Sequence, residues 1–363
     1  MKLQVTQENL SRALNNVARV ASTKNALPIL SNVLIKTIDN RVCVAATNLN
    51  IAITHYIGSK VTQEGSITVP ARLMQDFVAS LPSGVIDIKV EETKLHIVAD
   101  QYNSTINGTP ADDYPVMPQI KNGVSWSVPS LALKKSLQQV VLAASNDDAR
   151  PILTGIYFHT EKGNLYIAAT DSYRLAEKKV APLKEEVKLL VPASAMQDLL
   201  RILGDNEEEV KITHNEQQML FTVGDTELVT RLIDGNYPDY RKLVPASFAT
   251  SATLPKAELV NITKVSSLFA RESAGSVTLD LDEENKKISI RSIASQLGEN
   301  TATATADVNG TASITLNSRY ILDALGSVGD PEITISFNGK LEPCVIRGTK
   351  DKDYLHLIMP LKS

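Results

Sequence analysis

The sequence predicts an α+β protein of three similar domains, each with two helices packed against antiparallel sheets. Three observations support this fold class. The chain has 363 residues, of which 43% are apolar, enough for two or three domains with buried cores. Sequence segments recur at about one third of the chain length. Within each third, stretches with helical periodicity are followed by short alternating stretches bounded by turn residues.

The repeat is clearest between the first two thirds. Leu-Pro-Ile-Leu at 27–30 returns as Arg-Pro-Ile-Leu at 150–153, and Ala-Ala-Thr-Asn at 45–48 returns as Ala-Ala-Thr-Asp at 168–171, both 123 residues later. A fainter third copy occupies the rest of the chain. Because each copy of a repeat forms one structural unit, we expect domains at 1–121, 122–247 and 248–363.

Each copy is expected to contain two helices. Leu10, Leu14 and Val17 lie on one face of a helix that opens the first copy. The expected opening helices are 7–24, 130–145 and 256–271. The expected second helices are 71–81, 193–203 and 318–328.

Short strands are expected to fill the remainder of each copy. Residues 33–37 and 41–46 have strand composition and are joined by the turn residues Asp39 and Asn40. Units with this many strands leave sheet edges that must be paired or blunted. Pairing between units, or between chains, would satisfy those edges.

Positive charge is concentrated in the expected helices, although the whole chain has a net charge of −4. The six helices contain eleven basic and five acidic residues, a net charge of +6. The remainder contains 26 basic and 36 acidic residues, a net charge of −10. An ordinary solvated helix face explains such a bias in one helix, but its recurrence in three opening helices also suits contacts to phosphates.

Several functional classes find no support in the sequence. There is no P-loop and no glycine-rich dinucleotide motif, and the five histidines lack metal-ligand spacing. Cys43 and Cys344 are expected to be reduced core thiols. The sequence has no membrane-length apolar run and no signal peptide, so a cytoplasmic protein is expected.

One stretch has unusual chemistry, Ala-Thr-Asp-Ser-Tyr-Arg-Leu-Ala at 169–176. Asp171, Tyr173 and Arg174 suggest an acid–base cluster, and hence a hydrolase. No partner histidine is identifiable, and the corresponding stretch of the first copy lacks these ionisable groups. A binding rim on a loop is the favoured interpretation.

The chain resembles the bacterial sliding clamps, the β subunits of DNA polymerase III. The segments that carry the resemblance are Leu-Pro-Ile-Leu (27–30), Ala-Ala-Thr-Asp-Ser-Tyr-Arg-Leu-Ala (168–176), Asp-Gly-Asn-Tyr-Pro-Asp-Tyr-Arg (234–241) and Ile-Met-Pro-Leu-Lys-Ser (358–363). The resemblance implies clamp-type domains and a head-to-tail homodimer, a six-domain ring with helices inside. It implies a non-catalytic processivity factor without cofactor or metal.

The resemblance also implies partners and sites. The partners are double-stranded DNA without sequence preference and, through short linear motifs, the replicative polymerase, the clamp loader and repair proteins. The protein would act in the cytoplasm, associated with the nucleoid, and not at a membrane. The implied peptide-binding pocket consists of Leu153, Thr170, Ser172, Tyr173, Arg174, Leu175, Pro238, Leu243, Asn317, Tyr320, Leu341, Pro343, Leu357, Met359 and Leu361. The implied DNA-facing residues are Arg12, Arg19, Lys24, Arg72, Lys134, Lys135, Arg201, Lys256 and Lys264.

Some positions depart from the family pattern. Ser172-Tyr173 replaces a frequent Gly-His and Lys362-Ser363 replaces a terminal Arg-Leu, so peptide preference is expected to differ. At the subunit seam, residues 101–108 are uncharged, and an apolar seam from Ile106 with Leu268 or Phe269 is expected instead. A peptide-binding scaffold that never contacts DNA is the remaining alternative, and it predicts that charge reversal on the helices changes nothing.

Overall fold

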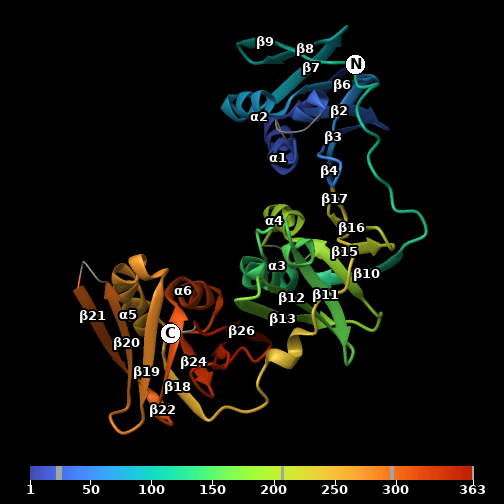
Figure 1. Ribbon diagram of the computed structural model, residues 1–363. Coiled ribbons are helices and arrows are strands. Elements are labelled where there is room, and N and C mark those ends of the chain that lie inside the picture. The colour runs from blue at the N-terminus through green and yellow to red at the C-terminus, as the bar shows by residue number, and fades with distance from the viewer. Residues whose placement is uncertain (22–26, 206–207, 295–297, 362–363) are drawn as a thin grey trace. The chain divides into compact units, whose positions relative to one another are not determined.

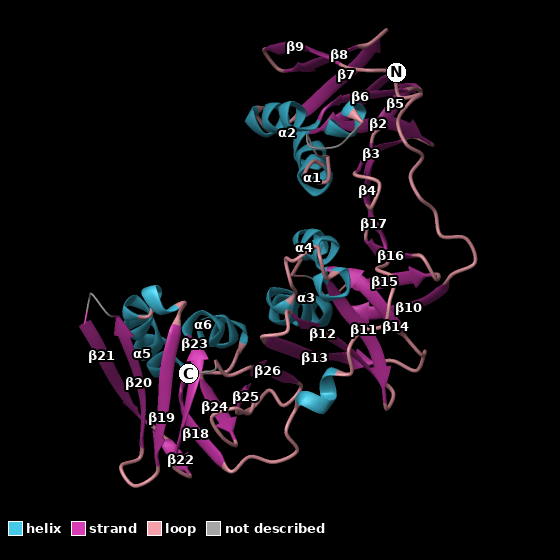
Figure 2. Cartoon of the chain, in the orientation of Figure 1, coloured by secondary structure: helices cyan, strands magenta, loops and turns pink. Residues whose placement is uncertain are grey.

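The computed structural model describes residues 1–21, 27–205, 208–294 and 298–361. The chain packs into two compact units, which we call unit 1 and unit 2. Unit 1 contains residues 1–131 and 194–232, and unit 2 contains residues 132–193 and 233–363. Figure 1 follows the chain through both units, and Figure 2 shows that each combines helices with sheets.

Unit 1 contains a five-stranded and an eight-stranded antiparallel sheet. The five-stranded sheet has the order β5-β1-β7-β8-β9, with β1 (Lys2–Thr6), β5 (Lys60–Gln63), β7 (Val85–Glu91), β8 (Lys94–Ala99) and β9 (Tyr102–Asn107). The eight-stranded sheet has the order β10-β15-β16-β17-β4-β3-β2-β6, with β2 (Asn32–Ile38), β3 (Arg41–Thr47), β4 (Ile51–Gly58), β6 (Ser66–Pro70), β10 (Val124–Pro129), β15 (Glu209–His214), β16 (Gln218–Val223) and β17 (Thr226–Arg231).

Unit 2 contains a nine-stranded and a four-stranded antiparallel sheet. The nine-stranded sheet has the order β14-β11-β12-β13-β26-β25-β24-β18-β22, with β11 (Gly155–Glu161), β12 (Asn164–Thr170), β13 (Arg174–Pro182), β14 (Lys188–Pro192), β18 (Thr250–Pro255), β22 (Asp307–Asn309), β24 (Glu332–Phe337), β25 (Cys344–Gly348) and β26 (Tyr354–Ile358). The four-stranded sheet has the order β21-β20-β19-β23, with β19 (Ser276–Asp282), β20 (Lys287–Ala294), β21 (Gly298–Thr305) and β23 (Ala312–Asn317).

The repeat explains this arrangement of sheets. In each large sheet, four strands of one repeat are joined edge to edge with strands of the next, through β4–β17 in unit 1 and β13–β26 in unit 2. We call these two strand pairs the first and second junctions. In the described residues, β9 pairs only with β8 and β21 pairs only with β20. These two strands occupy the repeat positions of β17 and β4, so each leaves an unpaired edge.

The predicted helices are present, but the opening helices are shorter than expected. The six helices are α1 (Gln7–Val17), α2 (Ala71–Ser80), α3 (Ser130–Val140), α4 (Ala193–Ile202), α5 (Lys256–Phe269) and α6 (Ser318–Ser327). Thr6 caps α1 by accepting a hydrogen bond from Asn9 N at 3.4 Å. Beyond Val17, Val20 is again buried, so the apolar pattern outlasts the helix. Likewise, α3 is followed by a 3₁₀ turn, Val141–Ala143, whose Ala143 is buried although it lies beyond the α-helix.

The cores are formed by alternating strand residues and by the helix faces. In β7, Ile86 and Ile88 are buried whereas Asp87 and Lys89 face solvent. Cys43 and Cys344 are free and buried, as expected. None of the described helices is long and apolar enough to cross a membrane. The described residues contain no group of three or more His, Cys, Asp or Glu placed to hold a metal ion.

Candidate functional site

The expected site is centred on the tight turn between β12 and β13. Thr170 Oγ1 accepts a hydrogen bond from Ser172 N at 3.1 Å and donates one to Arg174 O at 2.6 Å. Asp171 Oδ1 accepts from Tyr173 N and Arg174 N at 2.9 and 3.0 Å. Ser172 has a φ of 79°, in the left-handed region. Thr170 and Asp171 therefore fold the turn and leave the side chains of Ser172 and Tyr173 exposed.

Arg174 fixes this turn to α6. Its Nε donates to Asp171 Oδ2 at 3.0 Å, and its Nη1 donates to Asp323 Oδ2 at 2.6 Å. The guanidinium carbon lies 4.6 Å from the centre of the Tyr320 ring. Because the Arg174 side chain is only 12% exposed, these ion pairs are less screened than surface pairs. Asp323 was not among the site residues expected from the sequence, although it lies on the expected helix 318–328.

This network also explains the suspected acid–base cluster. Both carboxylate oxygens of Asp171 are occupied by backbone N–H groups and by Arg174. No described histidine is hydrogen-bonded to Asp171, Tyr173 or Arg174. The three residues therefore belong to the turn and to its attachment to α6. Their ionisable groups have a structural role here instead of a catalytic one.

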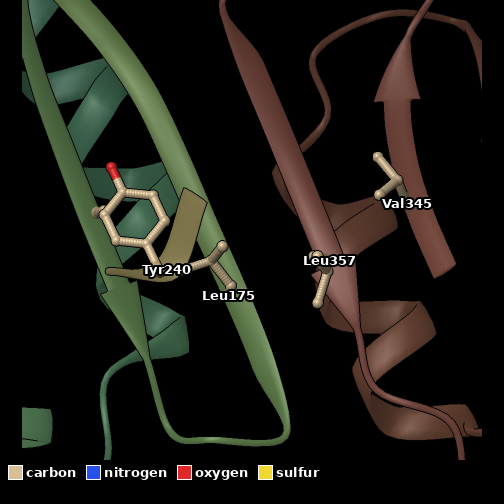
Figure 3. Close-up of a cluster of buried hydrophobic side chains, with 5 residues drawn as sticks. Leu175, Tyr240, Val345 and Leu357 are labelled. Carbon is tan, nitrogen blue, oxygen red and sulfur yellow. The ribbon is translucent and has the colours of Figure 1, made fainter. Parts of the chain in front are cut away.

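The second junction lies directly beneath this turn. Leu175 is paired with Leu357 in the β13–β26 ladder, and Met359 N donates to Tyr173 O at 2.8 Å beyond its end. The buried cluster on the junction is formed by Ala168, Leu175, Tyr240, Val345 and Leu357. Figure 3 shows Tyr240 and Leu175 on one side of the pair and Leu357 and Val345 on the other. Met359 is partly buried against this cluster, so the turn is built on a rigid base.

The Asp-Gly-Asn-Tyr-Pro-Asp-Tyr-Arg segment packs against the same sheet through its aromatic residues. Tyr237 stacks on Tyr157 with ring centroids 4.9 Å apart. Tyr240 OH is hydrogen-bonded to His159 Nε2 at 2.7 Å and donates to Glu177. Burial, with smaller contributions from Arg241 and Lys188, lowers the pKa of His159 to about 4. His159 is therefore neutral at pH 7.

Arg241 completes the attachment of this segment. Its Nε donates to Glu177 Oε2 at 2.9 Å, and its Nη1 pairs with Glu161. Its guanidinium lies 4.5 Å from the centre of the Tyr166 ring. These contacts hold the short 3₁₀ helix Tyr240–Leu243 on the sheet. Leu243, at its end, is 48% exposed.

The residues expected in the peptide pocket differ in exposure. Exposed residues are Ser172, Tyr173, Pro238, Leu243 and Leu341. Half-buried residues are Arg174, Asn317, Tyr320, Pro343, Met359 and Leu361. Buried residues are Leu153, Thr170, Leu175 and Leu357. Leu175 and Leu357, each 1% exposed, form the floor beneath the surface rather than its lining. Asn317 caps α6, since its Oδ1 accepts from Arg319 N at 2.9 Å.

In unit 1, three of the expected DNA-facing cations lie on helices: Arg12 on α1, Arg72 on α2 and Arg201 on α4. Arg19, expected on the opening helix, lies in the turn after α1, which ends at Val17. Arg12, Arg19 and Arg72 are exposed. Arg201 donates to Asp198 Oδ1 at 2.6 Å, yet its side chain remains 48% exposed. Lys24 lies outside the described residues. These helices therefore offer long cations to solvent.

In unit 2, two of the expected cations are engaged within the protein. Lys135 Nζ lies 3.5 Å from Asp351 Oδ2, and Lys256 Nζ donates to Val328 O at 2.7 Å. Lys134 is half-buried and Lys264 is exposed. Positive charge is consequently less available on these helices than on those of unit 1.

The residues expected at the seam lie near the two unpaired strands. Ile106 belongs to β9, but its side chain is 5% exposed and faces the core of unit 1. Leu268 is 51% exposed at the end of α5, and Phe269 is half-buried. The exposed apolar residues Val265 and Ile293, which the sequence analysis did not select, also lie on α5 and β20. Their exposure next to β21 is visible only in the structure and could not be predicted from the sequence.

The chain matches known proteins over its whole length. Three family descriptions of the DNA polymerase III beta subunit match: the N-terminal domain at residues 1–118, the central domain at 127–239 and the C-terminal domain at 241–362. The beta sliding clamp of Bacillus subtilis is 31% identical over 377 residues, covering all of both chains.

Solved structures agree with this match. The crystal structure of the Bacillus subtilis DNA polymerase sliding clamp is 30% identical with a TM-score of 0.94, covering 100% of this chain and 99% of that one. A DnaN sliding clamp of Pseudomonas aeruginosa, bound to griselimycin, is 25% identical with a TM-score of 0.94 and full coverage of both chains. With three consecutive domain matches, a full-length relative and the same fold, the chain belongs to the DNA polymerase III beta subunit family, the bacterial beta sliding clamps.

Proposed function

We propose that two copies of this chain pair head to tail through β9 of one copy and β21 of the other, closing a ring around duplex DNA. As a beta sliding clamp, the chain is a processivity factor of DNA polymerase III and not an enzyme. The finer points, namely the seam, the DNA-facing residues and the peptide surface, are proposals that rest on the residues described above.

The observation that carries the proposal is the pair of unpaired sheet edges. Within one chain, the strands in the positions of β17 and β4 pair twice, at the first and second junctions. The third pair of equivalent strands, β9 and β21, has no partner within the described chain. A second copy supplies the missing strand at each edge, which gives a closed assembly with six equivalent junctions.

Exposed apolar side chains reinforce this seam. Val265, Leu268 and Ile293 are between 47% and 59% exposed around β20 and α5. Tyr102, on β9, is 43% exposed. Burying such side chains on association contributes roughly 25 cal/mol per Å² of apolar surface. The seam therefore depends on apolar contact and backbone pairing instead of ion pairs.

The exposed arginines of α1, of the turn that follows it and of α2 are proposed to contact DNA phosphates. Arg12, Arg19 and Arg72 are long, flexible cations without sequence-reading geometry. Retention in a ring is topological, so individual contacts need only be weak. Weak contacts also leave the ring free to slide.

The surface around the β12–β13 turn is proposed to bind short linear peptides. Tyr173, Leu243, Leu341 and Met359 offer apolar contact above a buried floor. The proposed partners are the replicative polymerase, the clamp loader and repair proteins, and the proposed location is the cytoplasm at the nucleoid. Ser172 and Tyr173 at the rim should set a peptide preference of their own.

The experiment is a test of topological retention. The protein is loaded on nicked circular DNA by a clamp loader, separated from free protein by gel filtration, and the DNA is then cut once. Protein that leaves the cut DNA but stays on the uncut circle is held there as a closed ring. Equal loss from closed and cut circles would overturn the ring.

The seam is tested by sedimentation. Leu268→Asp should weaken the dimer at least tenfold, because it places a charge in an apolar contact. Val124→Asp is the matched control, since Val124 is 52% exposed on β10, the outer strand of the eight-stranded sheet, which contains neither β9 nor β21. An unchanged dimer in Leu268→Asp would place the seam elsewhere.

A further inference from the structure

Unit 1 contains a cavity of about 150 Å³ at the first junction. Its described lining residues are Thr47, Leu49, Asn50, Ile51, Ala52, Pro115, Val116, Pro118, Gln218, Val229 and Arg231. These residues come from the end of β3, the β3–β4 turn, the start of β4, the segment between β9 and β10, and the strands β16 and β17. A cavity of this size is large enough for a benzene-sized group.

The backbone around this cavity repeats the turn at the second junction. Thr47 Oγ1 accepts from Leu49 N and donates to Ile51 O, both at 3.0 Å, as Thr170 does in its own turn. Asn48 Oδ1 accepts from Asn50 N and Ile51 N at 3.1 and 2.8 Å, in the role of Asp171. Leu49 has a φ of 73°, close to the 79° of Ser172.

The strand pairing is also repeated in register. Ala52 pairs with Val229 as Leu175 pairs with Leu357. Arg231 N donates to Asn50 O at 2.9 Å, as Met359 N donates to Tyr173 O at 2.8 Å. Arg231 is thus the positional equivalent of Met359.

The side chains explain why the first junction is open. Ala52 and Val229, which line the cavity, are smaller than their equivalents Leu175 and Leu357, which pack in the buried cluster of the second junction. Leu49 and Val116, which are 48% and 95% exposed, offer apolar contact at the rim. Exposed apolar side chains beside a cavity are typical of a binding site.

The charge at the cavity selects the ligand. Arg231 is the charged residue among the described lining, and no ion-pair partner for its guanidinium occurs among the described residues. Thr47, Asn50 and Gln218 add neutral polar groups. An acidic side chain next to a medium-sized apolar one would meet both features.

We propose that this cavity is a second peptide-binding site, one that accepts an extended segment with an Asp or Glu beside an apolar residue. The inference rests on the proposed function in using the second junction as its geometric precedent. The two sites differ in the ligand that they select. Arg231, which would pair with an acidic side chain of the peptide, takes the position of the apolar Met359. One chain would then engage two peptides of different chemistry.

The test is methyl NMR of the full-length protein labelled at Ile, Leu and Val. The probe is the capped tetrapeptide Gly-Asp-Leu-Gly, titrated to millimolar concentration, with Gly-Lys-Leu-Gly as its matched control. We expect saturable shifts of the Leu49, Val116 and Val229 methyls with the acidic peptide. The Lys peptide should bind at least fivefold more weakly.

Two variants address charge and shape separately. Arg231→Gln should weaken the acidic peptide at least fivefold, while Lys211→Gln, which removes an exposed cation from β15 of the same sheet, should not. Ala52→Leu should fill the cavity and abolish the shifts without changing charge. Equal binding of both peptides, or binding unchanged in Ala52→Leu, would overturn the proposal.

The same spectra separate this inference from the proposed function. Leu243 and Leu355 report on the second junction. Shifts confined to those residues would reject the first-junction site and leave the proposed function in place. Shifts confined to unit 1 would support the inference and count against the proposed peptide surface.

Discussion

The first and second junctions share a backbone and differ in side chains. Both have a Thr-anchored turn, a left-handed residue at its tip and a backbone hydrogen bond from the neighbouring strand. The second junction fills its centre with leucines and fixes its turn by Arg174. The first junction has Ala52 and Ile51 at those positions and keeps a cavity. The difference shows that the two repeats share pairing geometry, whereas the volume and charge of their side chains differ.

The largest expected effect comes from making the second junction resemble the first. Leu175 is 1% exposed, so Leu175→Ala removes buried methyl groups and leaves a cavity. We expect unit 2 to lose about 2–5 kcal/mol of unfolding free energy. Urea unfolding of the full chain checks this, with Leu243→Ala at an exposed position as control. A loss under 1 kcal/mol would mean that the leucine floor does not stabilise the junction.

The pH dependence of unit 2 is the next largest effect. Burial lowers the pKa of His159 to about 4 and that of His356 to about 3, well below the ordinary 6.5 of an exposed histidine. Below pH 6.5 the unfolded chain binds more protons than the folded one, so stability falls as pH decreases toward 4. The loss from His159 alone is about 3 kcal/mol.

Unfolding at pH 7 and pH 4.5 measures this loss. His159→Gln should flatten the pH dependence because the titrating group is absent. A slope identical to that of the unchanged protein would show that His159 does not titrate in this range.

The two units should also differ in their response to removal of helix cations. Arg12→Gln with Arg19→Gln removes two exposed cations and should lower the salt slope of DNA binding by about two. Between 50 and 200 mM salt this amounts to roughly tenfold in affinity. Lys135→Gln with Lys256→Gln should do less, since both lysines already have partners in the protein. Fluorescence anisotropy at several salt concentrations ranks the two pairs, and the reverse order would contradict the assignment.

The smallest effect on stability is expected from an exchange at Arg231, the positional equivalent of Met359. Arg231 is exposed, so Arg231→Met should change unfolding free energy by about 0.5 kcal/mol or less. Met359→Arg should cost more, because Met359 packs against the buried cluster. Their effect on recognition is expected to be larger: Arg231→Met should lose preference for acidic peptides at the first junction. Calorimetry with the paired Asp and Lys peptides measures this. Retained acid preference would assign the charge selectivity to another residue.

Much of this architecture was predictable from the sequence. The matching Thr-Asn and Thr-Asp turns, and the six helix positions, follow from the repeat spacing and apolar periodicity. The helix ends did not, because Val20 is buried without being helical. The exposure of the site residues could not be predicted either. A leucine such as Leu175 shows the same sequence pattern whether it is buried beneath the surface or lines it.

The first-junction cavity could not be predicted for a different reason. The turns of the two junctions are 123 residues apart, but Arg231 and Met359 are 128 apart. A fixed offset therefore does not align them. Only the shared hydrogen bond to Asn50 or Tyr173 identifies the two as equivalent.

The unpaired strands β9 and β21 have a consequence for the newly synthesised chain. Before it forms the proposed pair with a second copy, each chain carries two sheet edges that have no partner among the described residues, and such edges are templates for uncontrolled association. Both edges are rich in Thr and Asn, and most of their side chains are exposed or partly exposed. Strands of this kind, with almost no charge and no proline, do not block edge-to-edge pairing. The single chain is therefore open to misassociation between synthesis and assembly, and pairing with a second copy removes that exposure.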